Sequence, residues 1–75
     1  MKETLLQYGY TYLRSCHCDG FYTEKFINGD YQCAVRVKKN IFKIKKGGHS
    51  VTQWIPVSRL EETLKTYSTN VAIQA

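Results

Sequence analysis

Alternation of apolar and basic side chains across residues 31–55 is the feature that most constrains how this 75-residue chain can fold. Gly47-Gly48 lies inside this stretch and suits a two-residue hairpin loop, because both loop positions require a positive φ. Lys39-Asn40 is a second turn candidate, since asparagine tolerates the left-handed region. The two turns together predict three antiparallel strands, at about residues 31–38, 41–46 and 50–55.

The predicted pairing divides the side chains of these strands between two faces. The first face is almost entirely apolar and collects Cys33, Val35, Val37, Phe42, Ile44, Val51 and Ile55. The second face is mostly basic and collects Gln32, Arg36, Lys38, Ile41, Lys43, Lys45, Thr52 and Trp54. In this register Val37 faces Phe42, Val35 faces Ile44, and Ile44 also faces Val51. A shift of one strand by one residue would bury lysines, so the pattern itself supports the register.

A C-terminal helix is predicted to cover the apolar face. Ser58 with Glu61 matches an S-x-x-E capping box, in which each side chain accepts a hydrogen bond from an otherwise unpaired backbone N–H. Apolar residues follow at helical spacing and form one stripe: Leu60, Leu64 and Tyr67. We therefore expect a helix over about residues 59–67 that packs on the sheet and closes the core.

Two hairpin signals lie in the N-terminal half, at Asp19-Gly20 and Asn28-Gly29. They bound two further strands, at about residues 10–18 and 21–27. A strict two-residue loop at Asn28-Gly29 pairs Glu24 with Cys33, which puts a carboxylate on the apolar face. A bulge after Asp30, or a longer loop, is expected to repair this conflict.

These elements predict a single α+β domain over residues 1–75. The expected fold is an antiparallel meander of four or five strands with the C-terminal helix packed on one face, and strong twist would curl it toward an SH3-like open barrel. A short helix is expected over Lys2 to Tyr8, stopped by Gly9. The tail at 69–75 is expected to be frayed or to add an edge strand.

The positive charge of the chain resides in the central stretch. Residues 31–55 hold six of the eleven Lys and Arg residues and no acidic residue, whereas the remaining residues sum to −1, giving the net +5. This basic balance indicates nucleic acid or another anionic partner. No apolar run approaches the roughly 20 residues of a membrane span. The absence of a secretion signal and the odd cysteine count favour the cytoplasm, and no membrane partner is expected.

Nucleic-acid binding by the basic face is the favoured function. Basic side chains neutralise phosphates and release counterions, and an aromatic ring can stack on a base. The expected binding residues are Arg36, Lys38, Lys43, Lys45, Lys46, Thr52 and Trp54. In the competing interpretation, lysines only keep sheet edges from pairing and Trp54 shields the lysine stems. The presence of only positive charges on this face favours binding, since an ordinary solvated face mixes both signs of charge. A compact basic chain of this kind is similar to many small accessory proteins of phages and mobile elements.

Zinc binding and catalysis are both less favoured. The candidate zinc ligands are Cys16, Cys18, Cys33 and His49. Their spacing lacks the C-x₂₋₄-C knuckle of structural zinc sites, so we expect no metal and no other cofactor. No convergent set of acid, base and nucleophile is visible, and we expect no enzyme activity.

Six tyrosines support an alternative function, which is protein–protein interaction as an adaptor, an inhibitor or a homodimer. Tyrosine is common in binding hot spots, and small domains often need the extra burial that a second copy provides. Tyrosine also fills the core of small β-rich folds with its hydroxyl in water. The sequence leaves both interpretations open.

Overall fold

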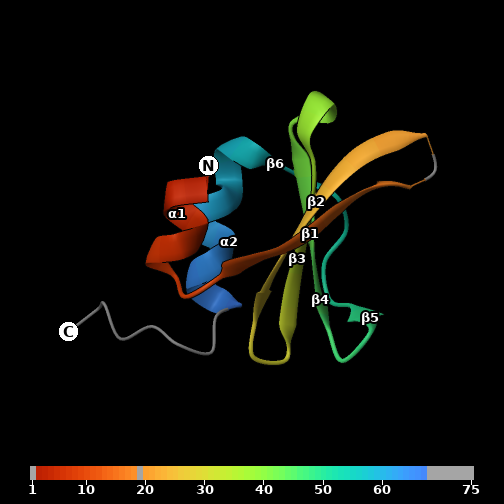
Figure 1. Ribbon diagram of the computed structural model, residues 1–75. Coiled ribbons are helices and arrows are strands. Elements are labelled where there is room, and N and C mark those ends of the chain that lie inside the picture. Colours follow the sequence, from red (N-terminus) through yellow and green to blue (C-terminus); the bar gives the residue numbers. More distant parts are fainter. Residues whose placement is uncertain (1, 19, 68–75) are drawn as a thin grey trace.

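The computed structural model describes residues 2–18 and 20–67, which form one twisted sheet and two short helices (Figure 1). The helices are α1 (Lys2–Gln7) and α2 (Leu60–Thr66). The strands are β1 (Thr11–Cys18), β2 (Phe21–Asn28), β3 (Tyr31–Arg36), β4 (Ile41–Lys46), β5 (His49–Ser50) and β6 (Ile55–Pro56). Short 3₁₀ helices at Val37–Lys39 and Val57–Arg59 follow β3 and β6.

The sheet is an antiparallel meander in the order β1-β2-β3-β4-β5, with β6 also paired to β4. The prediction of an α+β fold with a meander sheet and a C-terminal helix is therefore confirmed. The SH3-like open barrel is not confirmed, because β1 and β5 stand at the two ends of the strand order.

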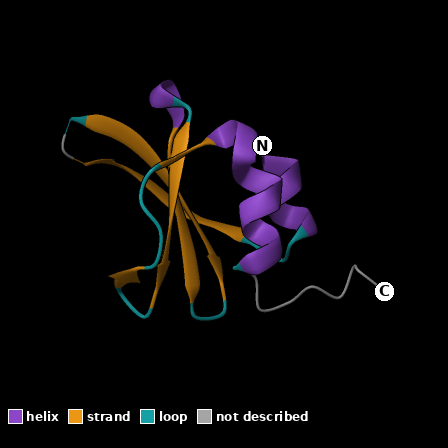
Figure 2. Ribbon diagram, turned by 180° about the vertical axis from the view of Figure 1, so that it is seen from behind, coloured by secondary structure: helices purple, strands orange, loops and turns teal. Residues whose placement is uncertain are grey.

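Both helices lie on the same side of the sheet, where they pack against each other (Figures 1 and 2). We call this side the inner face and the opposite side the outer face. The core lies between the helices and the inner face, and its buried members are Leu5, Tyr8, Tyr10, Phe26, Cys33, Val35, Phe42, Ile44, Leu60 and Leu64. Burial of these apolar side chains is the main driving force for the fold.

The Gly47-Gly48 hairpin forms as predicted. Lys46 pairs with His49, and the two glycines adopt φ values of 59° and 86°. A side chain at either position would be strained, because L-residues rarely adopt this region. The turn therefore sets the register at this end of β4, whose bounds also match the prediction.

The predicted two-residue turn at Lys39-Asn40 is wrong. Asn40 alone is left-handed, with φ 56°, and the chain turns through the 3₁₀ helix at Val37–Lys39 instead. A two-residue type I′ loop would also require a positive φ at the preceding lysine, which lysine adopts less readily. The strand predicted over residues 31–38 thus ends at Arg36, and Val35 pairs with Phe42 rather than with Ile44. The register moves by two residues, so both faces keep their side chains.

The predicted strand over residues 50–55 is split into β5 and β6. Between them the chain leaves the ladder, and the Ile44 carbonyl accepts hydrogen bonds from the N–H groups of both Val51 (2.9 Å) and Thr52 (3.4 Å). Four residues separate Ser50 from Ile55, whereas only two separate their partners Lys45 and Phe42 on β4. The interruption therefore acts as a bulge. The expectation that Val51 lies in the core is wrong: its side chain is 39% exposed.

The first two hairpins also differ from expectation in part. Cys18 pairs with Phe21, as the Asp19-Gly20 signal predicts. Asn28 pairs with Tyr31, so the second loop is Gly29-Asp30 and is neither bulged nor longer than two residues. The Asn28 side chain is buried and donates a hydrogen bond to the Tyr8 carbonyl (2.9 Å), which holds it in the strand.

The carboxylate of Glu24 remains on the inner face. Glu24 pairs with Val35 and not with Cys33, and its side chain is 14% exposed. The Lys2 ammonium of α1 lies 3.9 Å from this carboxylate and supplies the opposite charge. The conflict that the sequence shows is thus resolved by α1, not by a bulge in β3.

The predicted apolar stripe of α2 is confirmed, but the predicted capping box does not form. Leu60 and Leu64 are buried against the sheet. Ser58 lies inside the 3₁₀ helix at Val57–Arg59, so it is not the N-cap residue, and no side chain caps the helix start. The prediction for residues 69–75 falls outside the described residues. Within the part that is described, no helix is long and apolar enough to cross a membrane.

Candidate nucleic-acid interface

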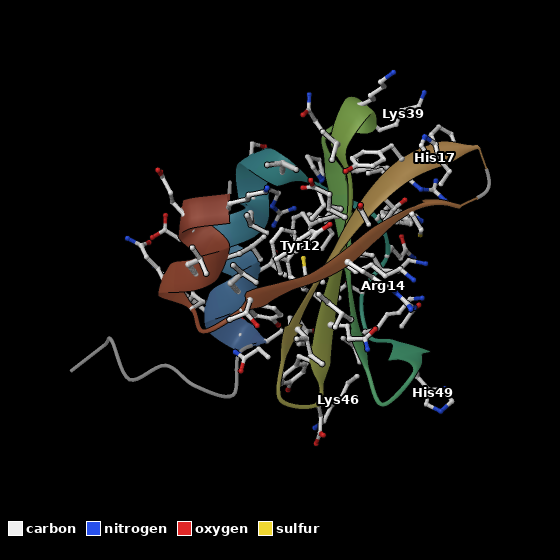
Figure 3. All side chains as sticks on the ribbon, in the orientation of Figure 1. Tyr12, Arg14, His17, Lys39, Lys46 and His49 are labelled. Carbon is white, nitrogen blue, oxygen red and sulfur yellow. The ribbon has the colours of Figure 1, made fainter. Side chains whose placement is uncertain are left out.

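The outer face carries basic side chains from four neighbouring strands. Arg14 pairs with Lys25, Lys25 with Ala34, and Ala34 with Lys43, so these residues form one row across β1 to β4. Figure 3 shows Arg14 extending away from the helices. Alternation along β3 and β4 adds two further cations to the same side. The outer basic face is therefore defined by Arg14, Lys25, Arg36, Lys43 and Lys45.

The acidic residues of the described chain lie elsewhere. Glu24 is on the inner face, Asp30 is in the β2–β3 turn, and the others are on the helices: Glu3, Glu61 and Glu62. Like charges placed directly opposite each other in a sheet, as Arg14 and Lys25 are, destabilise it. An anion bound across such a row relieves the repulsion.

A cavity of about 340 Å³ opens in the middle of the outer basic face. Its lining residues are Thr23, Lys25, Ala34, Arg36, Lys43, Lys45 and Trp54. Ala34 is only 7% exposed and has a short side chain, so it leaves space between the longer side chains of Lys25 and Lys43 on either side. The cavity therefore combines four cationic side chains with one aromatic wall.

Aromatic rings hold two of these cations in place. The Arg36 guanidinium carbon lies 4.2 Å from the centre of the Trp54 ring and 4.4 Å from that of Phe21. The Lys43 ammonium lies 4.8 Å from the centre of the Trp54 ring. Such cation–π contacts restrict the charged groups without neutralising them. The role of Trp54 as a base-stacking platform stays a prediction, because its ring is in contact with two side-chain cations.

The structure brings together four of the seven predicted binding residues, namely Arg36, Lys43, Lys45 and Trp54. Lys38 lies in the 3₁₀ helix after β3, beside a smaller cavity of about 100 Å³ that Arg36 also lines. Lys46 projects from the opposite side of β4, with its ammonium 5.3 Å from the centre of the Tyr31 ring. The Thr52 hydroxyl accepts a hydrogen bond from the Ile44 N–H (3.0 Å) and donates one to the Gln53 carbonyl (2.9 Å), so it supports the bulge.

Arg14 and Lys25 were not predicted from the sequence. A signal for both exists in the Asp19-Gly20 hairpin, because its two-residue loop pairs Arg14 directly with Lys25. The net charge hid them, because the six acidic residues outside residues 31–55 offset their charge in the sum over that part of the chain.

Three of the candidate zinc ligands, Cys16, Cys33 and His49, are not brought together. Cys33 is fully buried in the inner face, whereas Cys16 lies on the outer side of β1 and His49 at the exposed β4–β5 turn. Cys18 is the last residue of β1. Burial raises the pKa of the Cys33 thiol to about 12, which opposes the thiolate that a metal requires. Among the residues described, no group of three or more His, Cys, Asp or Glu side chains is placed to hold a metal ion.

Most of the tyrosines contribute to the core and its border, and few to an open surface. Tyr8 and Tyr10 are buried, and the rings of Tyr31 and Tyr67 meet edge-on with centres 6.2 Å apart. Burial, with smaller contributions from Cys33 and Tyr31, raises the pKa of the Tyr10 phenol. Tyr12, on the edge strand β1, is the large exposed exception at 51%.

Comparison of the chain with protein-family models, with curated proteins and with solved structures finds no match.

Proposed function

We propose that this protein is a non-catalytic nucleic-acid-binding module that uses the outer basic face of its sheet. The observation that carries the proposal is the gathering of five cations from four strands on a face without a carboxylate in the described chain. In this account Arg14, Lys25, Lys43 and Lys45 neutralise phosphates and release counterions. Arg36 is held in position by Trp54 and Phe21 and adds its positive charge beside the same ligand.

Lys38 and Lys46 are exposed outside the outer basic face and extend the positive potential at its two ends. Their contribution is long-range and weaker, because water and salt screen exposed charges. Thr52 is proposed as a structural residue and not as a ligand contact, since both hydrogen bonds of its hydroxyl are made within the chain.

Charge reversal on each side of the sheet tests this proposal. Lys43→Glu alters the outer basic face, and Lys65→Glu makes the same change of net charge on α2, on the helix side of the sheet. In fluorescence anisotropy at low salt with a labelled oligonucleotide, we expect Lys43→Glu to weaken binding about tenfold or more and Lys65→Glu to change it little. Circular dichroism verifies that both variants are folded. Equal effects of the two variants would show that only net charge matters, and no binding by the wild type would refute the proposal.

Protein association is a second candidate, favoured by apolar side chains on α1 and on the edge strand β1. Leu6, Tyr12 and Leu13 are 59%, 51% and 43% exposed. An edge strand with exposed apolar residues can pair with another chain. Sedimentation velocity of the wild type and of Leu13→Asp measures self-association. A wild-type dimer that Leu13→Asp converts to a monomer supports this function, and a wild-type monomer at high concentration removes the homodimer.

A further inference from the structure

We propose that the 340 Å³ cavity is a subsite for one unstacked nucleotide, so that the protein binds single strands in preference to duplexes. This inference rests on the proposed function and adds to it the class of nucleic acid. It follows from the width of the outer basic face and from the shape and lining of the cavity.

The outer basic face is too broad to enter a duplex groove. The row from Arg14 to Lys43 crosses four strands, or three strand spacings of about 4.8 Å, which is roughly 14 Å between the outermost backbones. The major groove of B-DNA is about 12 Å wide and admits a ribbon of two strands. A duplex therefore meets this face only through its phosphates, and its base edges stay out of reach. A flexible single strand can lie across the face.

The cavity has the chemistry of a nucleotide site. Its volume lies in the range of roughly 300–1,000 Å³ typical of ligand pockets. Lys25 and Lys43 flank Ala34 at two strand spacings, about 10 Å apart at the backbone, so their ammonium groups can hold phosphates on either side of a ring. The short Ala34 side chain provides a floor for the base, and the Trp54 ring, with Arg36 and Lys43 against it, provides an aromatic wall.

The base that enters this cavity must leave its stack. In a single strand the π-faces of the bases are accessible, whereas extruding a base from a duplex costs a few kcal/mol. The cavity therefore adds affinity for single strands that duplexes do not gain. Phosphate contacts alone would give no such preference.

The experiment compares one fluorescein-labelled oligothymidylate of twelve residues, alone and annealed to its complement, by anisotropy at low salt. We expect the single strand to bind at least about tenfold more tightly than the duplex, given the cost of extruding a base. Ala34→Leu fills the cavity, and we expect it to weaken single-strand binding about five- to tenfold while leaving duplex binding unchanged. Ala34→Ser is the matched control, because it adds one oxygen atom and leaves the cavity open.

Trp54 supplies a second measurement that needs no variant. It is the only tryptophan of the chain and lines the cavity, so its fluorescence reports on a ligand that enters there. Unlabelled oligothymidylate should quench this emission at saturation, and the duplex should quench it little.

Each outcome separates the subsite from the proposed function. Equal affinity for single strand and duplex, with Lys43→Glu weakening both, would overturn the subsite and leave nucleic-acid binding intact. Equal loss of single-strand and duplex binding in Ala34→Leu would likewise overturn the subsite, because the substitution would then act on the whole face and not on single strands alone. Absence of binding by either ligand would overturn the subsite and the proposed function together.

Discussion

The two faces of β4 carry opposite chemistry within six residues. Phe42 and Ile44 are fully buried on the inner face, whereas Lys43 and Lys45 line the cavity on the outer face. On the inner side the partly buried Glu24 carboxylate is balanced by an ammonium group of α1, while on the outer side Arg14 and Lys25 lie directly opposite each other. Stability therefore resides on one side of the strand, and the proposed function on the other. Each side can therefore be changed separately.

Truncation of Phe42 should give the largest effect. Phe42→Ala removes a fully buried ring from the core, and we expect a loss of about 3–5 kcal/mol in the free energy of unfolding. The neighbouring variant Lys43→Ala removes mainly a cation–π contact with Trp54, and we expect a loss below about 1 kcal/mol. Urea unfolding followed by circular dichroism measures both variants. Similar losses in the two would contradict the assignment of the faces.

Alkaline pH should act on the inner face through Cys33. Burial raises the pKa of its thiol from 9.0 to about 12, so its stabilising contribution is complete below pH 9. Above pH 9 the unfolded chain releases this proton first, and the free energy of unfolding falls as the pH rises toward 12. We expect a loss of roughly 2 kcal/mol between pH 8 and pH 10.5, at about 1.4 kcal/mol per pKa unit.

The variant Cys33→Ala isolates this effect. It should unfold more easily at pH 8 because it leaves a small void, yet lose less stability than the wild type between pH 8 and pH 10.5. Tyr10, whose pKa is also raised by burial, titrates at higher pH and remains in both proteins. If wild type and variant show the same pH dependence, burial of the thiol does not control it.

Removal of the Thr52 hydroxyl should give the smallest effect. It tests whether Thr52 supports the sheet or contacts the ligand. Thr52→Val deletes the acceptor of the Ile44 N–H, and we expect a loss of about 1 kcal/mol in the free energy of unfolding. Oligonucleotide affinity should stay within about twofold of the wild type, since the hydroxyl bonds within the chain. A large loss of affinity without a loss of stability would restore Thr52 as a ligand contact.

Alternation in the sequence was sufficient to predict the faces of the sheet, because a side-chain period of two survives a register error of two residues. Val35 and Phe42 lie on the inner face whether they are paired with each other or with the partners that were predicted. The glycines of the β4–β5 turn set the local register correctly, since their conformation is rare for other residues. The length of the turn predicted at Lys39-Asn40 was wrong, because a two-residue loop needs a positive φ at both positions and only Asn40 adopts one readily.

Tertiary contacts decided the remaining features. The chain leaves β4 after Ser50 and returns at Ile55, which exposes Val51 and places Trp54 beside Arg36. No local pattern in residues 51–54 marks this departure. The cavity likewise depends on Lys25 and Lys43 flanking a small residue across three strands. Such a juxtaposition requires the register of two separate hairpins to be known.

The salt dependence of single-strand binding tests the central claim most directly. If the five cations of the outer basic face contact phosphates, the logarithm of the binding constant should fall linearly with the logarithm of salt concentration. The expected slope is near −3.5, from about −0.7 per contact for single strands. A slope near zero, or no binding of single strands at low salt, would contradict the assignment of this face to nucleic acid.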